Sequence, residues 1–326
     1  MSRAVVIERP RELRLVRIEP QLPGHGEAVV RVAWSGICGS DREVFAGTRA
    51  EGYVRYPVTP GHEWSGTVVE LGPGTDQSLL GKQVVGEGFR NCARCDACRR
   101  GDTNLCEAAY DETGFTRPGA WADELRLPAR LLHELPADAD LRAAALLEPA
   151  ACMAAAALTA NVVPGERVAV VGGGTLGMLA VQLLAASSPG SLVVVDPRRD
   201  RLELARRFGA TSAAPEDDLD PFDAVVEAAG APGTGSLAVG LTKRGGRTVL
   251  TGLAGTETVP LVPADLVAAA VTVHTVFGAS SAAWTHAVRA FATGLLDPAP
   301  LITHEFALEN AEDALATIVG KVLLHP

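Results

Sequence analysis

The sequence has 326 residues, of which 47% are hydrophobic, and a formal net charge of -10 at pH 7. The length predicts two domains, because a single hydrophobic core rarely grows this large. The acidic balance argues against nucleic acid as a partner, since phosphate binding needs a basic surface. No apolar run reaches the about 18 residues of a membrane span, and the charges along residues 1–15 argue against a signal peptide. We therefore expect a cytoplasmic protein with reduced cysteines.

The first half of the chain predicts short strands and turns. Strand-like runs at residues 4–8, 27–36 and 65–72 are separated by proline and glycine. The pattern changes near residue 143, where the Ala-rich run 143–161 favours a helix despite the proline within it.

Beyond this helix, predicted strands and helices alternate. Residues 163–188 predict a strand, a glycine loop and a helix, and residues 191–210 predict a strand, a turn and a helix. Three further strand candidates follow, at 222–230, 245–255 and 268–279. This alternation is typical of an α/β fold with a doubly wound parallel sheet and helices on both of its faces. The tail predicts a helix at 282–296, a strand at 301–308 and a last helix from Glu309.

The glycine loop predicts a dinucleotide site. Residues 172–177 fit the pattern G-x-G-x-x-G, follow a buried strand and open a helix, which is the context that the pattern requires. Gly172 allows the tight turn, Gly174 lets the backbone approach a pyrophosphate, and Gly177 lets the helix and strand pack closely. Thr175 and Leu176 begin the helix, whose free N–H groups favour phosphate.

Asp196 ends the next predicted strand and bears on the choice of cofactor. A carboxylate at this place can accept hydrogen bonds from the ribose hydroxyls and would repel a 2′-phosphate, which favours NAD. Arg198 and Arg199 follow directly; they could bind a 2′-phosphate or form a solvated turn. We predict NAD, with NADP as the alternative.

Four cysteines form the most specific local pattern of the chain. Cys92, Cys95, Cys98 and Cys106 have the spacing C-x2-C-x2-C-x7-C within one loop. Four thiolates this close suit a closed, tetrahedral, structural zinc site. Disulfides are disfavoured in the cytoplasm, and an iron–sulfur cluster ranks second because its characteristic spacings differ from this one.

Three further segments carry residues that can bind a metal. Cys38 follows a predicted strand, His62 and Glu63 lie in a turn before another, and Glu148 opens the predicted domain junction. A catalytic zinc takes about three protein ligands of these types and keeps one position open. Each residue alone has an ordinary alternative, as a small buried side chain, a polar turn or a helix cap. Their order upstream of a dinucleotide loop favours a catalytic metal site.

Together these segments resemble the zinc-dependent medium-chain alcohol dehydrogenases. GICGSD, PGHEWSGTVVELG, the four-cysteine loop, LLEPAA and VGGGTLG stand in that family's order along nearly the whole chain. The glutamate after His62 and the Glu148-Pro149 pair are similar to the polyol branch, which includes sorbitol and threonine dehydrogenases. YPVTPGHEWSGTVV and GFTRPGA also resemble the dehydrogenases of aminocyclitol antibiotic pathways, such as those that oxidise 2-deoxy-scyllo-inosamine.

The resemblance implies two domains. Residues 1–148 and 280–326 would form a GroES-like, β-rich catalytic domain, and residues 149–279 a Rossmann NAD-binding domain. It also implies a homodimer or homotetramer, for which residues 271–278 are a candidate sheet edge. Relatives usually place a helix after Ala210, whereas the short acidic run 211–221 predicts a loop here.

The resemblance also implies two zinc ions per chain, one structural and one catalytic. Cys38 and His62 would hold the catalytic zinc, with Glu63 and Glu148 as carboxylates that coordinate it or exchange with water. The residues leave open which of the two carboxylates binds at rest.

The implied chemistry is hydride transfer between an alcohol, polarised by zinc, and a nicotinamide. Ser40 can hydrogen-bond the substrate oxygen and start proton release. Many relatives carry a proton-relay His five residues after the zinc Cys, where this chain has Glu43. Either Glu43 replaces it or protons leave through water. We favour water, because a carboxylate with its ordinary pKa of about 4 is a weak base for an alcohol.

We predict a zinc-dependent oxidoreductase that transfers a hydride between NAD(P) and a secondary alcohol of a polyol, cyclitol or amino alcohol, with a small-molecule alcohol or ketone as its partner. An oxidoreductase of another alcohol, aldehyde or ketone class is an alternative, since fold does not fix function. A zinc-free quinone reductase would lack the cysteine loop, and a non-catalytic NAD- and metal-binding protein would lack Ser40. Substrate specificity is expected from loops around aromatic residues that could equally be ordinary packing: Phe45, Tyr53, Tyr56, Phe115 and Trp121.

Overall fold

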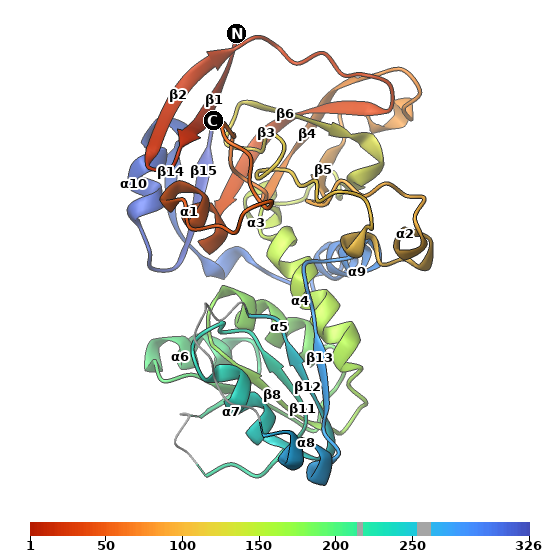
Figure 1. The fold of residues 1–326 in the computed structure, drawn as a ribbon, viewed down its shortest axis with the longest axis vertical. Coiled ribbons are helices and arrows are strands. Elements are labelled where there is room, and N and C mark those ends of the chain that lie inside the picture. Colours follow the sequence, from red (N-terminus) through yellow and green to blue (C-terminus); the bar gives the residue numbers. More distant parts are fainter. Residues whose placement is uncertain (214–217, 253–261) are drawn as a thin grey trace. The chain divides into compact units, whose positions relative to one another are not determined.

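The computed structural model describes residues 1–213, 218–252 and 262–326 (Figure 1). The chain divides into two compact units. Unit 1 contains residues 1–148, 280–292 and 297–326, and unit 2 contains residues 149–279 and 293–296. The tail therefore belongs to the same unit as the N-terminal half. No helix in the described ranges is long and apolar enough to cross a membrane.

Unit 1 is built on a seven-stranded mixed sheet. Six of its strands follow the order β14-β15-β3-β4-β5-β7, and β6 also pairs with β3. A separate antiparallel pair is formed by β1 and β2. The strands are β1 (Ser2–Arg9), β2 (Glu12–Ile18), β3 (Glu27–Ile37), β4 (Trp64–Leu71), β5 (Gln83–Gly86), β6 (Glu124–Pro128), β7 (Leu132–Glu134), β14 (Ile302–Ala307) and β15 (Lys321–His325).

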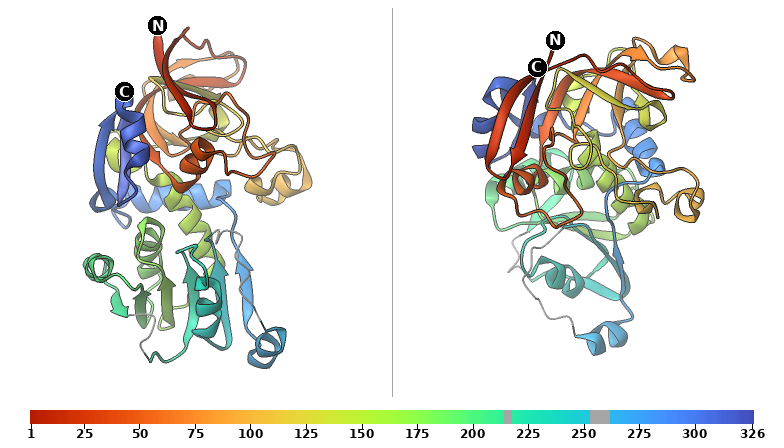
Figure 2. Two further views of the ribbon diagram at one scale, coloured as in Figure 1. Left: turned by 60° about the vertical axis from the view of Figure 1, so that its left-hand side comes forward. Right: turned by 45° about the horizontal axis from the view of Figure 1, so that its top comes forward.

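The tail is part of the core of unit 1. Val322 and Leu324 of β15 share a buried cluster with Val5, Ile37 and Trp121 from the N-terminal half. Burying one such side chain stabilises the fold by about 1.5–3 kcal/mol. Figure 2 shows β14 and β15 in blue beside the red strands of the N-terminal half. The return of the tail is therefore fixed by hydrophobic packing as well as by strand pairing.

Short helices connect the strands of unit 1. They are α1 (Gly39–Ala46), α2 (Asp96–Arg100), α3 (Leu141–Ala144), α9 (Ser281–Ala292) and α10 (Ala311–Ala316), with 3₁₀ turns η1 (Gln77–Leu79), η2 (Thr103–Leu105), η3 (Ala129–Leu131), η4 (Ala299–Leu301) and η5 (Leu308–Asn310). The Ala-rich helix α4 (Leu147–Ala160) starts in unit 1 and continues in unit 2. Pro149 is tolerated in α4 because it lies in the first turn, where N–H groups have no partner within the helix.

Unit 2 is a six-stranded sheet in which every pairing is parallel. Its order is β10-β9-β8-β11-β12-β13, the doubly wound order, which reverses between β8 and β11. The strands are β8 (Arg167–Val171), β9 (Ser191–Val195), β10 (Thr211–Ala213), β11 (Phe222–Glu227), β12 (Thr242–Leu250) and β13 (Thr272–Thr275). The helices are α5 (Thr175–Ala185), α6 (Arg199–Arg207), α7 (Thr234–Gly240) and α8 (Pro263–Ala269). The predicted α/β fold with a doubly wound sheet is confirmed.

Three local predictions differ from the structure. The run predicted as a loop after Ala210 begins with strand β10, which pairs with β9; residues 214–217 of that run lie outside the described residues. The last helix starts at Ala311 after a 3₁₀ turn, not at Glu309. Strand β15 was not predicted at all. Residues 253–255 of one strand candidate also lie outside the described residues.

Candidate metal centres and dinucleotide loop

Strand pairing in unit 1 brings three candidate metal ligands together. Cys38 directly follows β3, and His62 and Glu63 directly precede β4. The two strands are antiparallel, with Ser35 opposite Trp64, so these segments meet at one end of the pair. One ligand atom from each of Cys38, His62 and Glu63 lies within 4.8 Å of the other two. A thiol, an imidazole and a carboxylate at this separation form a donor set that suits zinc.

Two glycines make room for this group. A Cβ atom on Gly36 would collide with the carboxylate of Glu63, and a Cβ atom on Gly61 would collide with the indole of Trp121. Gly61 also has φ +96°, a left-handed conformation that favours glycine. The close approach of Glu63 to the end of β3 therefore requires glycine at position 36, although glycine is not a metal ligand and no ligand motif would identify it.

Cys38 is the N-cap of α1, where it exchanges two hydrogen bonds with Asp41. Its Sγ accepts the backbone N–H of Asp41, and its own N–H donates to Asp41 Oδ2 at 2.8 Å. The first turn of α1 therefore orients the Sγ atom of this candidate metal ligand.

His62 has one ring nitrogen toward a buried carboxylate. Its Nδ1 lies 3.3 Å from Oδ1 of Asp41, whose side chain is fully buried, and its Nε2 lies 3.5 Å from Ser40 Oγ. A carboxylate behind an imidazole is the usual support of a metal-binding histidine. Burial lowers the pKa of His62, but the charges and close contacts of Asp41 and Cys38 together raise it well above its ordinary value. Metal binding at Nε2 would displace this proton.

Lys321 lies beside this group although it comes from β15. It is 5% exposed, and its Nζ donates to Glu63 Oε2 and, at 3.2 Å, to the carbonyl of Ile37. Burial lowers the pKa of Lys321, but the charge and hydrogen bond of Glu63, with the charges of Cys38 and Asp41, together outweigh burial and raise this pKa. The motifs of the sequence do not identify Lys321, because its role depends on β15; the one signal is a lysine that opens the apolar run of residues 321–325.

Glu148 lies in the first turn of α4 and is half-buried. Burial raises the pKa of Glu148 to about 7, with the charge of Glu63 adding to the effect and that of His62 opposing it. Glu148 is thus electrostatically coupled to the group. In the described part of the chain, however, the compact ligand set contains Glu63 rather than Glu148.

A polar cluster centred on Arg49 flanks His62. The guanidinium of Arg49 lies 3.9 Å from the ring centroid of Phe115, whose ring lies 4.7 Å from that of His62. Arg49 also lies 3.5 Å from Glu43 and 3.9 Å from Glu112. The side chain of Glu43 is 51% exposed, so this residue sits at the outer side of the cluster.

Glu112 is the buried acid of this cluster, and our sequence analysis missed it. It accepts a hydrogen bond from Tyr110, and burial raises its pKa to about 8. A carboxyl group with this pKa is largely protonated at neutral pH. No local pattern distinguishes Glu112 from a surface acid in the same loop.

The five predicted aromatic residues fall in different places. Phe115 packs against His62. Tyr53 is 42% exposed and lies against Tyr110, with ring centroids 4.7 Å apart. Trp121 and Phe45 pack with the hydrophobic core, and Tyr56 donates its hydroxyl to the carbonyl of Val44. Of these residues, Phe115 has a direct contact with the ligand group.

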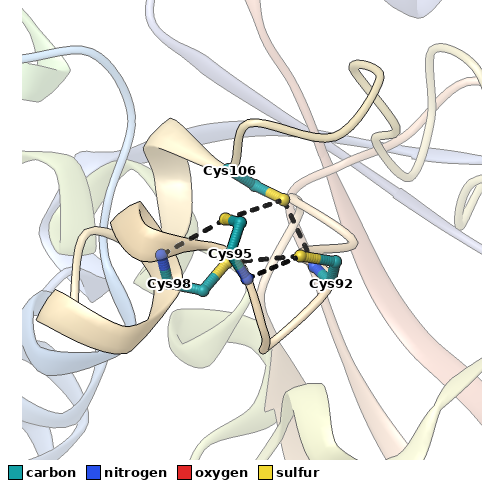
Figure 3. A group of neighbouring side chains, drawn as sticks. All are labelled: Cys92, Cys95, Cys98 and Cys106. Carbon is teal, nitrogen blue, oxygen red and sulfur yellow. Dashed lines mark hydrogen bonds between the residues drawn. The ribbon is translucent and has the colours of Figure 1, made fainter.

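The four predicted lobe cysteines converge around one centre (Figure 3). The Sγ atoms of Cys92 and Cys98, and those of Cys95 and Cys106, are 4.0 Å apart. This S···S distance is much longer than a disulfide bond. It is close to the roughly 3.8 Å that separates two sulfur atoms bound to one tetrahedral zinc with zinc–sulfur bonds of about 2.3 Å. The four sulfur donors and the distances between them therefore suit a zinc site with no open position.

Backbone N–H groups turn toward these sulfur atoms. Cys95 Sγ accepts N–H groups from Cys98 and Glu107, and Cys92 Sγ accepts one from Cys95. Hydrogen bonds from the backbone N–H groups of Arg94 and Cys95 lower the pKa of Cys92 to about 6, whereas burial raises that of Cys98 to about 12. A bound metal would stabilise all four thiolates together.

The lobe extends from the body of unit 1 and is tied back to it at α9 (Figures 1 and 2). Thr103 Oγ1 accepts the N–H of Ser281 at 2.9 Å and lies 3.1 Å from its hydroxyl. Ser281 in turn donates to Glu87 at 2.9 Å. A polar chain therefore anchors the lobe to the start of α9.

In unit 2 the glycine loop follows β8, at the point where the strand order reverses. Gly172 has φ +104°, and a Cβ atom on Gly177 would collide with the carbonyl of Gly172. Gly174 is the N-cap of α5, which Thr175 and Leu176 begin. Open sheets of this kind bind their ligands at this reversal, and the N-terminus of α5 offers free N–H groups there.

Asp196 follows β9 and lies against the glycine loop. It is 4% exposed, and its Oδ2 accepts the N–H of Gly173 at 2.7 Å. Its Oδ1 accepts the N–H of Arg198 at 2.8 Å, and Arg201 lies 3.5 Å from Oδ2. The structure thus places Asp196 and Arg198 together at the loop and adds Arg201, which no sequence motif indicates.

These features define a class of proteins that pair a doubly wound dinucleotide fold with a Cys/His/Glu metal-ligand group and a cysteine lobe. The comparisons agree with this. Residues 24–137 match the alcohol dehydrogenase GroES-like domain, and residues 175–293 match the zinc-binding dehydrogenase domain.

Whole-chain relatives give the same result. The chain is 32% identical to L-threonine 3-dehydrogenase of Streptomyces coelicolor, over 94% of this chain and 93% of that one. It is 28% identical to sorbitol dehydrogenase of Bacillus subtilis, over 99% and 97% of the two chains. A zinc-binding dehydrogenase structure from Sinorhizobium meliloti, bound to NADP, is 28% identical with a TM-score of 0.93, and the match covers 100% of this chain and 99% of that one. The chain therefore belongs to the zinc-dependent medium-chain alcohol dehydrogenases, in the polyol branch.

Proposed function

We propose that this protein oxidises a secondary alcohol of a polyol, a cyclitol or an amino alcohol with NAD, or reduces the corresponding ketone. The observation that carries this proposal is the compact group of Cys38, His62 and Glu63 with the Ser40 hydroxyl 3.5 Å from His62. The family relatives support a polar alcohol as the substrate class.

Cys38, His62 and one of the two carboxylates, Glu63 or Glu148, would hold a catalytic zinc. When bound, zinc supplies Lewis acidity that lowers the pKa of the substrate hydroxyl. Cys38 and His62 come from the ends of paired strands, and Asp41 Oδ1, 3.3 Å from His62 Nδ1, can orient the imidazole. The four lobe cysteines would hold a second, structural zinc, which gives two per chain.

Ser40 is placed to accept a hydrogen bond from the substrate hydroxyl and to pass its proton outward. Glu43 then stands where relatives carry a relay histidine. Its half-exposed carboxylate lies 3.5 Å from Arg49 at the outer side of the cluster, where water can reach it. We therefore favour proton exit through water. Glu43→Gln should change the rate of hydride transfer by less than about threefold across the pH profile, and a much larger loss in single-turnover measurements would contradict this route.

Asp196 supports NAD as the cofactor, because its buried carboxylate lies at the glycine loop where a 2′-phosphate would be repelled. Arg198 and Arg201 are the opposing feature, and a similar structure holds NADP. We expect kcat/KM to be at least about tenfold higher with NAD than with NADP. The opposite ratio would assign the arginines to a 2′-phosphate.

The proposal also covers the cellular compartment and the oligomeric state of the protein. The proposed zinc site of the lobe needs four thiolates, which fits a reducing compartment such as the cytoplasm. Strand β13 ends the sheet of unit 2 and could pair with a second copy, which supports a homodimer or homotetramer. Gel filtration with light scattering would measure the assembly.

The decisive experiment combines a substrate panel with metal analysis. Polyols, cyclitols and amino alcohols are assayed with NAD and with NADP, and zinc is counted per chain. Two zinc ions and turnover of one of these alcohol classes support the proposal. Turnover without metal at Cys38 and His62 overturns the mechanism, and turnover confined to simple aldehydes overturns the substrate class.

A further inference from the structure

The backbone around Cys38 is held by charged side chains on three sides. Lys321 Nζ donates to the carbonyl of Ile37 at 3.2 Å, and Asp41 Oδ2 accepts the N–H of Cys38 at 2.8 Å. Arg42 Nη1 donates to the carbonyl of Cys38 at 3.3 Å. Arg42 is therefore the charged side chain that fixes the carbonyl of this candidate metal ligand.

The same guanidinium reaches the end of α10. Arg42 Nε donates to the carbonyl of Leu315 at 3.1 Å, and Nη2 donates to that of Thr317 at 2.7 Å. Thr317 is the C-cap of α10. Carbonyl groups at a helix C-terminus lack partners within the helix and carry partial negative charge, so a guanidinium is well suited to them. Within the described ranges, Arg42 forms no ion pair with a carboxylate, and backbone carbonyls are its partners.

Arg42 and Lys321 connect Cys38 and Glu63, two members of the candidate ligand group, to the same segment, residues 315–321. Thr317 stands four residues before Lys321, which bonds Glu63. Arg42 thus links the carbonyl of Cys38 to the segment that contains Lys321, the cation beside Glu63. A half-buried arginine with three separate carbonyl partners resists movement in a way that an exposed arginine does not.

We propose that Arg42 is a positioning residue of the catalytic metal site, which sets the metal affinity of Cys38 by tying the carbonyl of Cys38 to the end of α10. The inference rests on the proposed function in one respect, that Cys38 binds metal. Ligand groups must be held within about 0.5 Å of their productive places. Loss of a partner that orients a metal ligand typically weakens metal binding by about 10- to 100-fold.

The test replaces zinc by Co²⁺ in the full chain and compares Arg42→Met with the unchanged protein. Co²⁺ affinity is measured by competition with a chelator, and the thiolate–cobalt absorption bands report ligand geometry. We expect the affinity of the Cys38 site to fall by about 10- to 100-fold with altered bands. The four-cysteine lobe, which lies in the same chain, should keep its affinity.

Two variants control for a merely structural effect. Arg126→Met also removes a hydrogen bond to a backbone carbonyl, that of Leu22 at 3.1 Å, and should leave Co²⁺ affinity unchanged. Arg42→Lys keeps the charge but has one nitrogen in place of three, so we expect an intermediate loss of affinity. If Arg42→Met does not fold, Arg42→Lys decides the question by itself.

The outcomes separate this inference from the proposed function. Two bound metal ions in the unchanged protein, with the affinity and the bands of the Cys38 site preserved in the Arg42 variants, overturn the inference alone, even if thermal stability falls. A single bound metal ion, confined to the lobe, overturns both. Weakened binding at the Cys38 site alone supports the positioning role.

Discussion

The four-cysteine lobe takes all of its sulfur atoms from residues 92–106, whereas the Cys38 group takes its ligands from residues 38–63 and its supporting cation from residue 321. The lobe supports its sulfur atoms with backbone N–H groups of the same loop. The Cys38 group uses buried side chains of opposite charge instead, with Asp41 behind His62 and Lys321 beside Glu63.

The difference separates two ways to hold a metal. A loop that supplies four like ligands can close a tetrahedron by itself and leaves no open position. A group of mixed ligands from distant segments depends on the whole fold, and its buried charges must be matched one by one. The arrangement of the lobe suits a structural metal site, and the arrangement of the Cys38 group suits a catalytic one. Four substitutions test this contrast, from the largest expected effect to the smallest.

His62→Ala should abolish most activity while the lobe keeps its metal. The loss of the imidazole empties the Cys38 site, and a Lewis acid worth several kcal/mol corresponds to a fall of roughly 10³-fold in kcat/KM. Zinc should decrease from two to one per chain by elemental analysis. If both metals were lost together, the two sites would not be independent.

Lys321→Met should destabilise unit 1 strongly. It leaves Glu63 as a buried carboxylate without its cation, and breaking a buried pair in this way costs about 3–5 kcal/mol. All four tryptophans lie in unit 1, so urea unfolding followed by tryptophan fluorescence reports this unit. The double variant Lys321→Met with Glu63→Gln removes both charges and should recover much of the loss; equal stability of the single variant and the unchanged protein would contradict a matched pair.

Glu112→Gln should stabilise unit 1, increasingly with pH. Burial raises the pKa of Glu112 to about 8, so the folded state holds a proton that the unfolded chain releases above its ordinary value near 4.5. The unchanged protein therefore loses stability as pH rises from about 4.5 toward 8, whereas glutamine has no proton to lose. The free energy of unfolding should differ by roughly 2–4 kcal/mol at pH 8 and little at pH 4.5. A difference independent of pH would place an ionised Glu112 in the folded state.

Thr103→Val should have the smallest effect, since it removes only the acceptor for the Ser281 N–H and the hydroxyl contact that anchor the lobe. Its cost should be about 1 kcal/mol, with both metals and kcat retained. Thr285→Val, on the exposed side of α9, is a matched control that removes a hydroxyl bonded within the helix. A loss of lobe zinc from Thr103→Val would show that the anchor also shapes the ligand geometry.

Local patterns predicted the lobe, the glycine loop and the doubly wound sheet, because their determinants are close in the sequence. Cys38, His62 and Glu63 were predictable as candidates from their order relative to predicted strands. The side chains that support these residues could not be predicted from the sequence. Lys321 meets Glu63 only through the pairing of β15 with β3, and Arg42 meets Thr317 only through the packing of α10. Glu112 and Arg49 share a cluster formed by two loops that no spacing relates.

The position of Lys321 also sets an order of assembly during synthesis. All four sulfur atoms of the lobe are available once residue 106 has left the ribosome, so this loop can take up its metal early. The Cys38 group has its ligands by residue 63, yet its buried Glu63 has no cation until residue 321 has emerged and β15 has paired with β3. We therefore expect the ion pair that supports Glu63 to form only after the tail has been synthesised, whereas the backbone support of the lobe sulfur atoms can form earlier.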